Sequence, residues 1–501
     1  MIKQLVSIFT LGLLINTTNL IAQSDVDALR LGMQYSNGSA RNMGLGNTMG
    51  SIGGELSSIH TNPAALGRIT SSEVSLTPVV SIFNSNSNYI GKITEDSKLK
   101  FGVYNFSAAM VSKYVSNYGK WSTPKVGFSF NNLANLNQNF YISGFNQHNS
   151  LVDKYFELLD EHASTTNDLE NMFPFNASLA YNTDLVYFDT TDHRIYSAIN
   201  NGNVQQDIVI QRKGNLNEMA IAVASTYSGE KRKIHIGATI GVPTLNFTES
   251  TIHKETDTPD SSYNFNFFKQ NSSFRVSGLG VNLKLGLLAE LSKNVRLSFA
   301  FQTPSVLFLN DAFNSKINAD YVTYTAEAES PEGLMKYNLR LPWKLNTGMS
   351  YISKIGLIAA EYELSDAGAS KYNYKNADAD IKEEQRALNQ TIKNKYKLYH
   401  TLKLGLEAKI DPIRLRGGVQ IQSSPFDKNF VADQSGQLNF IYSAGVGYRK
   451  NKFAIDLAYQ FTKGKESYTP YVLQNEAPQF QYTSENNFKR SVIALTLGYK
   501  F

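Results

Sequence analysis

Residues 453–461 read Phe-Ala-Ile-Asp-Leu-Ala-Tyr-Gln-Phe, and residues 493–501 end the chain with Ile-Ala-Leu-Thr-Leu-Gly-Tyr-Lys-Phe. In both runs a large apolar residue occupies every second position, and small or polar residues occupy the positions between. Successive side chains of a β-strand point to opposite faces, so each run predicts a strand with one apolar and one mostly polar face.

The same alternation recurs along the chain, at residues 281–291, 295–301, 337–345, 398–410 and 413–421. Alternation alone would also suit a soluble β-sandwich, so the connections decide between the two. Short and long connections take turns: Ser292-Lys293-Asn294, Asp411-Pro412 and Lys450-Asn451 are tight, whereas residues 314–336, 365–395, 424–437 and 465–486 are long and polar. Tight turns at one end and long loops at the other are typical of outer-membrane barrels.

Fourteen segments start near Glu73, Leu99, Lys125, Leu216, Lys233, Gly280, Val295, Tyr337, Ile355, Leu398, Ile413, Leu438, Lys452 and Lys489. The expected fold is therefore all-β, a transmembrane antiparallel barrel of about 14 strands, an even number as single-chain bacterial barrels require. Residues 204–213 also alternate, and we assign them to a long outer loop. Residues 151–162 and 377–392 have the pattern of amphipathic helices within outer loops.

The composition agrees with a barrel and excludes several other classes. Charged residues make up 18% of the 501, against roughly 25% in a typical globular protein, and Tyr (28), Phe (29) and Gly (34) are abundant. The mature chain has no run of ~20 apolar residues, which excludes a helical membrane protein. Cysteine is absent, which excludes thiol catalysis and disulfides. The diffuse net charge of +5 gives no support to nucleic-acid binding.

The N-terminus has the layout of a secretory signal peptide. Lys3 precedes an apolar stretch over residues 5–15, and the small residue Ala22 offers a cleavage site before Gln23. We therefore expect residues 1–22 to be removed on export. With the barrel pattern, this predicts a protein of the Gram-negative cell outer membrane.

Residues 23–72 differ from the rest of the chain. They are rich in Gly, Ser and Asn, lack strand alternation, and include Gly44, Gly46, Gly53 and the motif Asn62-Pro63-Ala64. Turn signals combined with apolar residues such as Leu45 and Leu66 favour an ordered plug in the barrel lumen over a free periplasmic segment. We thus expect a luminal hatch over residues 23–72 and a barrel with long extracellular loops over residues 73–501.

Two tight turns predict pairs of charges on the inner wall. The turn at residues 292–294 places Glu290 opposite Arg296, and the turn at Asp411-Pro412 places Glu407 opposite Arg416. Cross-strand pairs of opposite charge contribute ~0.2–1 kcal/mol each. We therefore interpret these pairs as stabilisers of the wall rather than as transport machinery.

Several stretches together resemble one family. They are residues 44–67 with Asn62-Pro63-Ala64, Leu-Arg-Leu-Pro-Trp at 339–343, Arg-Gly-Gly-Val at 416–419, and the last seven residues. In these stretches the chain resembles the FadL/TodX-type outer-membrane transporters of hydrophobic compounds. The resemblance implies a hatch-plugged barrel for passive uptake of hydrophobic small molecules such as long-chain fatty acids. It also implies capture among the outer loops, a site beside the hatch, and lateral exit where the third strand is kinked.

The asparagine-rich run after Phe130 is the candidate for that kink. Alternation ends there, and Asn131, Asn132, Asn135 and Asn137 follow within seven positions before Phe140. Asparagine is a poor strand former. The run is either a kink in the third strand, which would form the lateral opening, or an outer loop after a strand that ends at Phe130.

Other function classes receive less support. The seven histidines are scattered outside any nucleophile or metal-ligand motif, so neither an enzyme nor a metal site is expected, and no cofactor. A general porin would lack the plug, and an adhesin-type structural barrel is permitted by the long loops. The expected partners are a hydrophobic ligand, outer-membrane lipid and the barrel-assembly machinery, through the C-terminal Phe501. We expect a monomer that binds no nucleic acid.

Overall fold

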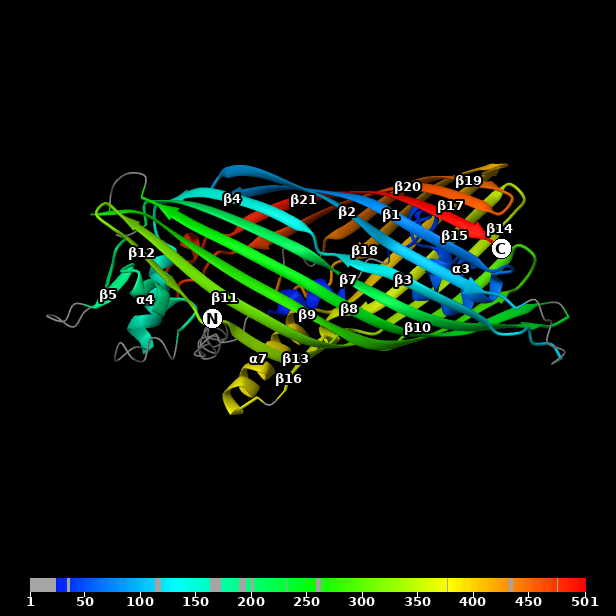
Figure 1. Cartoon of the computed structure of the whole chain (residues 1–501), viewed down its shortest axis with the longest axis horizontal. Helices are drawn as coiled ribbons and strands as arrows, with labels where there is room; N and C mark the ends of the chain where they lie inside the picture. The colour runs from blue at the N-terminus through cyan, green and yellow to red at the C-terminus, as the bar shows by residue number, and fades with distance from the viewer. Residues whose placement is uncertain are drawn as a thin grey trace, which may run out of the picture.

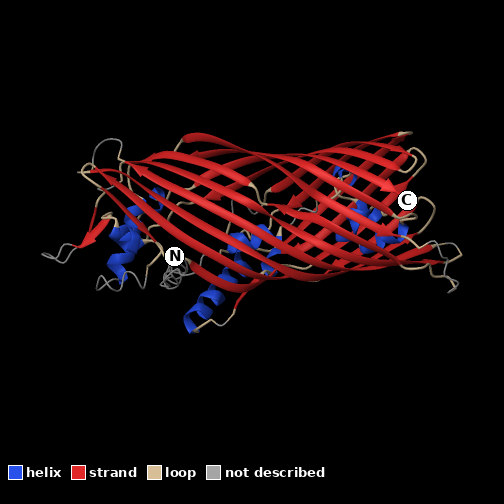
Figure 2. Ribbon diagram, viewed as in Figure 1, coloured by secondary structure: helices blue, strands red, loops and turns tan. Residues whose placement is uncertain are grey.

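The computed structural model describes residues 24–33, 37–112, 119–162, 173–188, 195–199, 202–230, 232–257, 262, 264–375, 377–431, 436–474 and 476–501. The predicted signal peptide, residues 1–22, lies outside the described residues. Figures 1 and 2 show the chain as one long barrel of strongly tilted strands with helices inside it and at one end.

The described strands form a closed antiparallel barrel of fourteen strands, as the alternation predicts. The first strand begins at Glu73, and closure joins β1 to β21 from the pair Glu73 and Lys500 upward. Ten of the barrel strands are continuous: β1 (Glu73–Tyr89), β2 (Lys92–Met110), β7 (Val204–Ser228), β8 (Lys233–Thr256), β9 (Phe265–Glu290), β17 (Leu398–Ile410), β18 (Ile413–Ser423), β19 (Leu438–Lys450), β20 (Phe453–Tyr468) and β21 (Ser484–Lys500).

The other four barrel strands are interrupted, and each comprises two elements on a common neighbour. They are β3 (Lys125–Asn135) with β4 (Gln138–Asn146), β10 (Val295–Gln302) with β11 (Val306–Tyr321), β13 (Gly333–Arg340) with β14 (Lys344–Ile352), and β15 (Gly356–Asp366) with β16 (Lys371–Tyr374). For example, β3 and β4 both pair with β7. A further strand, β12 (Thr325–Glu329), pairs with β11, and β5 (Val186–Phe188) pairs with β6 (Ile195–Ser197).

The assignment of residues 204–213 to an outer loop is wrong. They form the first part of β7, and they pair with β4 on one side and β8 on the other. The reason is the length of the wall, because β7, β8 and β9 have 25, 24 and 26 residues. A membrane-spanning strand needs only ~9–11 residues, so these strands continue well beyond the bilayer.

The outer face of the barrel carries rows of exposed apolar side chains. On β20, the outward residues Phe453, Ile455, Leu457 and Tyr459 are between 44 and 60% exposed. Their inward neighbour Asp456 is buried. This inversion, apolar outside and polar inside, is that of a barrel surrounded by lipid. No helix within the described ranges is long and apolar enough to cross a membrane.

The segment before β1 folds inside the barrel as five short helices. They are α1 (Asp25–Gly32), α2 (Ala40–Gly44), α3 (Met49–Ile52), and the 3₁₀ helices η1 (Leu56–His60) and η2 (Pro63–Arg68). The side chains of Ser24, Ser39 and Asn62 accept backbone N–H bonds and so cap three of them. Figure 1 shows α3, in blue, inside the end of the barrel that carries the C-terminus.

The opposite end carries a cap of helices. Here α4 (Leu151–His162) and α6 (Ala177–Asn182) pack with β5, β6, β11 and β12 into one apolar cluster (Figure 1). The helix α7 (Ala379–Lys395) lies near mid-barrel beside α1, and the 3₁₀ turns η3 (Ala367–Ala369) and η4 (Pro478–Phe480) complete the described helices. Both helices predicted within loops, α4 and α7, are therefore present.

Candidate functional site

The Asn62-Pro63-Ala64 motif fastens the hatch to the barrel wall. Asn62 Oδ1 accepts from Ala64 N at 3.0 Å, and Asn62 Nδ2 donates to the carbonyls of Gly50 (3.1 Å) and Leu287 (3.3 Å). One amide therefore closes the turn before η2, joins it to α3 and reaches the main chain of β9.

The wall carries glycine at the two positions nearest this motif. Gly237 on β8 and Gly286 on β9 are ladder partners. A Cβ added at Gly286 would lie 2.1 Å from Asn62 Oδ1, and one added at Gly237 would lie 2.6 Å from Pro63 O. Any larger residue would push the hatch away, so this glycine pair permits the close approach.

A second contact lies on β17, β18 and β19. Gly46 has φ +64°, a left-handed conformation that favours glycine. It packs on Gly418, where an added Cβ would lie 2.2 Å from Gly46 N. An added Cβ at Gly405, the ladder partner of Gly418, would lie 2.3 Å from Leu45 O. The two contacts fix the hatch to separate parts of the wall.

Glu290 and Arg296 are ladder partners, as the turn predicts, but each side chain makes its hydrogen bond or ion pair with another residue. Arg296 Nη1 instead donates to the carbonyl of Ile52 in the hatch at 2.6 Å. Glu290 pairs with Arg68 of the hatch and with His235 of β8, both at 3.2 Å. The turn sets the register, but the hatch supplies nearer partners for both charges.

Glu407 and Arg416 do lie in contact. Arg416 Nε donates to Glu407 Oε2 at 2.6 Å, and its Nη1 donates to Asp456 at 2.7 Å. Arg41 of the hatch lies 3.6 Å from the same Glu407 oxygen. This pair therefore also belongs to a network that ties the hatch to the wall.

A buried cluster at mid-wall holds the hatch from a third side. His60 Nδ1 lies 2.7 Å from Glu218 Oε1 on β7, which also accepts from Lys284 Nζ at 2.6 Å. All three residues are at most 4% exposed. Burial lowers the pKa of His60, so Lys284 supplies the positive charge that offsets Glu218. No group of three or more metal-ligating side chains occurs in the described part of the chain.

The asparagine-rich run interrupts the third barrel strand. β3 ends at Asn135, β4 begins at Gln138, and the register of β3 against β7 shifts between Asn132 and Ala134. The strand therefore continues beyond Phe130, and the alternative in which it ends there is wrong. All four asparagines are buried, and each uses its amide in a hydrogen bond.

These hydrogen bonds hold the break in place. Asn131 Nδ2 donates to Asn37 O of the hatch at 2.5 Å, and Asn132 Nδ2 donates to Asn217 Oδ1 at 2.9 Å. Asn137 Nδ2 donates to Gly214 O at 3.0 Å, and Asn135 Nδ2 donates to the hydroxyl of Tyr104 on β2 at 3.0 Å.

A gap in the wall lies beside the break. The ladder between β2 and β3 ends at Asn105 and Asn131, although β2 continues to Lys92. A cavity of about 80 Å³ lies at this point, lined by five consecutive β2 residues, 100–104, and by Phe130, Asn135, Asn215 and Asn217 among others. Above it, Lys98 Nζ donates to Asn139 Oδ1 at 3.1 Å and so joins β2 to β4.

A larger cavity lies in the lumen above the hatch. Its volume is about 590 Å³, which is within the usual range for small-molecule sites. The lining includes Val26 and Leu29 of α1, the following residue Met33, Ala134, Phe426 and Phe430, and Ile441, Phe488 and Val492 of β19 and β21. Tyr104 and Asn135 line both this cavity and the wall gap. Their hydrogen bond therefore separates the two spaces.

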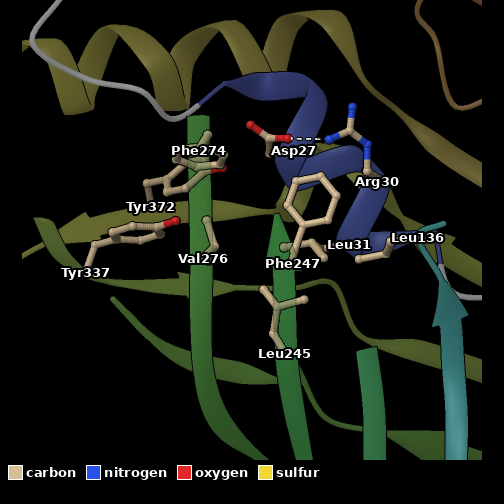
Figure 3. A pocket seen from close by; sticks show the side chains of 10 residues that line it. All are labelled: Asp27, Arg30, Leu31, Leu136, Leu245, Phe247, Phe274, Val276, Tyr337 and Tyr372. Atoms are coloured by element: carbon tan, nitrogen blue, oxygen red, sulfur yellow. Dashed lines mark hydrogen bonds and ion pairs between the residues drawn. The ribbon is translucent and has the colours of Figure 1, made fainter. Parts of the chain in front are cut away.

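The other side of α1 faces a tightly packed apolar pocket (Figure 3). Leu245 and Phe247 of β8, Phe274 and Val276 of β9, and Leu136 surround Leu31, in a space of only about 10 Å³. That volume holds about one water molecule. Asp27 pairs with Arg30 at 2.7 Å at its edge, and burial raises the pKa of Asp27. The helix α1 thus forms a partition between a filled and an open apolar space.

Sequence reasoning missed Tyr104, Arg490 and the apolar residues of α1. Tyr104 lies within a strand that is otherwise ordinary, and its partner Asn135 is distant in sequence. Arg490 carries a weak signal, since it is a cation between Phe488 and Val492 on the inward-facing row of β21. The apolar residues of α1 were included in the hatch, but no sequence feature relates them to a cavity.

The sequence matches no family model, and no curated protein sequence matches it. Solved structures do match. A Pseudomonas aeruginosa FadL homologue superposes with a TM-score of 0.52 at 12% identity, over 94% of this chain and 100% of that one. The P. putida toluene transporter TodX gives 0.49 at 12% identity, over 92% and 98%. The Ralstonia pickettii toluene transporter TbuX gives 0.47 at 10%, over the same shares. The first match shows that this chain shares the FadL fold.

Proposed function

We propose that this chain is an outer-membrane channel of the FadL/TodX type, through which hydrophobic small molecules such as long-chain fatty acids enter passively. The observation that carries the proposal is the cavity of about 590 Å³ beside the hatch, which shares Tyr104 and Asn135 with a gap in the wall. A site for an apolar molecule therefore adjoins a sideways route into the membrane.

The hatch makes a sideways route more favourable than a downward one. Below the cavity an apolar molecule would have to displace a segment fixed at Gly286, at Gly418 and at Glu218. It would also pass a set of charged groups, and an apolar molecule offers no hydrogen bond to replace the water around them. These groups are Arg41, Arg68, Arg296, Glu290 and Glu407. The gap beside Tyr104 leads to lipid instead, where an apolar molecule is soluble.

The same geometry supports lateral exit at the third strand. Outward residues Phe101 and Val103 of β2 are exposed and apolar, and they border the gap. Breaking the hydrogen bond between Asn135 and Tyr104 would join the cavity to this surface. One neutral hydrogen bond is worth about 0.5–1.5 kcal/mol net, a barrier small enough for passive passage.

Capture of the ligand at the outer loops is proposed to use aromatic side chains that line the cavity. The apolar face of α4 does not form an open groove, because Val152, Tyr155 and Leu159 are buried in the cap. Phe426 and Phe430, in the loop between β18 and β19, line the cavity together with Tyr396, which precedes β17.

The proposal is tested by lipid extraction and mass spectrometry of the protein purified in mild detergent, with a cavity-filling variant alongside. Ala134 is buried and lines the cavity, so Ala134→Phe should remove the co-purified apolar compound. The matched control is Ala444→Phe, on the exposed face of β19. Equal recovery from both variants and the native chain would place the compound in the detergent belt and contradict a luminal site.

Assembly is proposed to depend on the C-terminal residue. Phe501 is 67% exposed, and its N–H donates to Ser72 O at 2.9 Å beside the first strand. Its exposed ring is available to the barrel-assembly machinery. We expect Phe501→Ala to lower the amount of inserted barrel without changing ligand recovery per molecule, and we expect the inserted protein to be monomeric by size-exclusion chromatography with light scattering.

A further inference from the structure

The barrel wall has a second gap, between β19 and β20. Their ladder begins at the tight turn with Lys450 and Phe453 and ends at Ile441 and Thr462. On its other side, β20 remains paired with β21 up to Tyr468 and Ser484. Residues 463–468 thus extend past the last rung shared with β19, which leaves this edge of β20 facing the loop between β18 and β19.

The luminal cavity reaches this edge. Its lining includes five consecutive residues of β20, Lys463 to Ser467. Consecutive residues of a strand point to opposite faces, so a cavity inside a closed wall touches alternate residues only. A cavity that touches consecutive residues lies against the edge of the strand. The gap between β2 and β3 shows the same feature, with residues 100–104 of β2.

The other border of the opening is mostly apolar. It consists of Pro425, Phe426, Phe430 and Val431 of the loop, with the polar Asn439 at the start of β19. Phe430 is 61% exposed, and Leu438, next to Asn439, is 54% exposed. Both side chains therefore present apolar surface where the cavity meets the outside of the barrel.

The opening lies at the upper limit of the apolar outer surface. The outward row of β20 runs Phe453, Ile455, Leu457, Tyr459 and Phe461, and then changes to Lys463 and Lys465. Aromatic residues followed by lysines mark the interface between the lipid core and the head groups. The opening therefore faces the head-group region of the outer leaflet rather than the bulk water above the cap.

We propose that this opening admits an amphiphile dissolved in the outer leaflet sideways into the luminal cavity. The inference rests on the proposed function, because it requires that the cavity bind such molecules. The apolar cluster of α4, α6, β11 and β12 packs at the capped end of the barrel, and the side opening reaches the cavity without passing through this cluster. A molecule would then enter between β19 and β20 and leave between β2 and β3.

The experiment exploits the absence of cysteine from the chain. Lys465→Cys and, separately, Asn487→Cys are labelled with a bulky maleimide in lipid nanodiscs. The two positions are ladder partners, both exposed on the outer face, but only Lys465 borders the cavity. Association of fluorescent oleic acid, added to the nanodisc bilayer, is followed over time, and Ala134→Phe defines the signal that does not come from the cavity.

The label at Lys465→Cys should slow association by about tenfold or more, a change within the range by which association rates of one site vary. The label at Asn487→Cys should change it less than about twofold by the same measure. Equal rates in the two labelled variants, whether fast or slow, would overturn the side opening as the route. If unlabelled protein gave no signal above Ala134→Phe, the cavity would not bind oleic acid and the proposed function itself would fail.

Discussion

Arg490 of β21 donates from Nη1 to the main-chain oxygen of Asn135 at 2.7 Å and from Nη2 to that of Asn137 at 3.3 Å. One side chain thus binds two carbonyls at the point where the third strand is interrupted. Between β21 and β3 lie β1 and β2, so the break must bend into the lumen to meet Arg490. The guanidinium also lies over the ring of Phe83, 5.4 Å from its centre.

Removing this cation should loosen the break. Arg490→Met leaves the carbonyls of Asn135 and Asn137 without the guanidinium, which typically costs about 1–3 kcal/mol locally. We expect faster amide hydrogen exchange over residues 131–139, measured by mass spectrometry. The control is Lys489→Met, the exposed neighbour that faces outward. Unchanged exchange in Arg490→Met would show that the break is held by the asparagine bonds alone.

Tyr104→Phe should speed the release of ligand. It removes the hydroxyl that accepts from Asn135 between the cavity and the wall gap, while it keeps the aromatic ring. The loss of about 0.5–1.5 kcal/mol would raise the release rate by roughly two- to tenfold. Stopped-flow release of fluorescent oleic acid measures it. Tyr448 is an exposed tyrosine elsewhere on the barrel, so Tyr448→Phe should leave the release rate unchanged. If Tyr448→Phe raised the release rate as much as Tyr104→Phe, the effect would not come from the gap.

Gly286→Ala should displace the hatch without unfolding the barrel. The new Cβ would lie 2.1 Å from Asn62 Oδ1, a contact that the hatch can relieve only by moving. We expect raised permeability to small polar solutes in proteoliposomes. At Gly417 an added Cβ would meet nothing closer than a Leu406 atom at 3.8 Å, so Gly417→Ala serves as the control. An inserted but unleaky Gly286→Ala barrel would argue against close packing at this point.

The cap formed by α4 and α6 should loosen as the pH rises. Burial raises the pKa of Asp153 in α4 from 3.8 to about 7, and the charges of Glu255, Glu157 and Glu476 add to this. Between these pH values the folded cap holds a proton that the unfolded segment has released, so the stability of the cap falls as the pH rises towards 7 and levels off above it.

Hydrogen exchange of residues 151–159 at pH 5.5 and pH 8, corrected for intrinsic exchange, measures this effect. We expect the native cap to open on the order of tenfold more often at the higher pH, since one pKa unit of differential stabilisation corresponds to a factor of ten. Asp153→Asn should abolish the difference. A native cap that opens equally at both pH values would exclude Asp153 as the responsible group.

The sequence predicts the barrel well because its strongest signals are local. Alternation and tight turns depend on near neighbours, and they place the turn at Asp411-Pro412 and the contact of Glu407 with Arg416. The assignment of residues 204–213 to a loop failed because alternation cannot show where a strand leaves the membrane. The tight turn also predicts correctly that Glu290 and Arg296 are ladder partners. It cannot predict that Arg68 and the carbonyl of Ile52 contact them, because these groups come from the hatch.

The candidate site is less predictable because it consists of contacts between distant segments. The asparagine run marks the break in the third strand, but Arg490 is 355 positions from Asn135. The gap between β19 and β20 arises where their ladder stops, and no sequence pattern that we identified marks this position. The role of the glycines at 237, 286, 405 and 418 can be seen only when the hatch atoms that pack against them are known.

The proposed function requires an apolar molecule to occupy the lumen beside α1. Photo-crosslinking with a diazirine derivative of oleic acid, followed by peptide mapping, tests it most directly. We expect adducts at Leu29 of α1 or at the following Met33, near Phe426, and on the inward residues Ile441 and Val492, all lost in Ala134→Phe. Adducts confined to outward residues such as Leu457 and Tyr459 would show the probe only in the surrounding lipid and would contradict the claim.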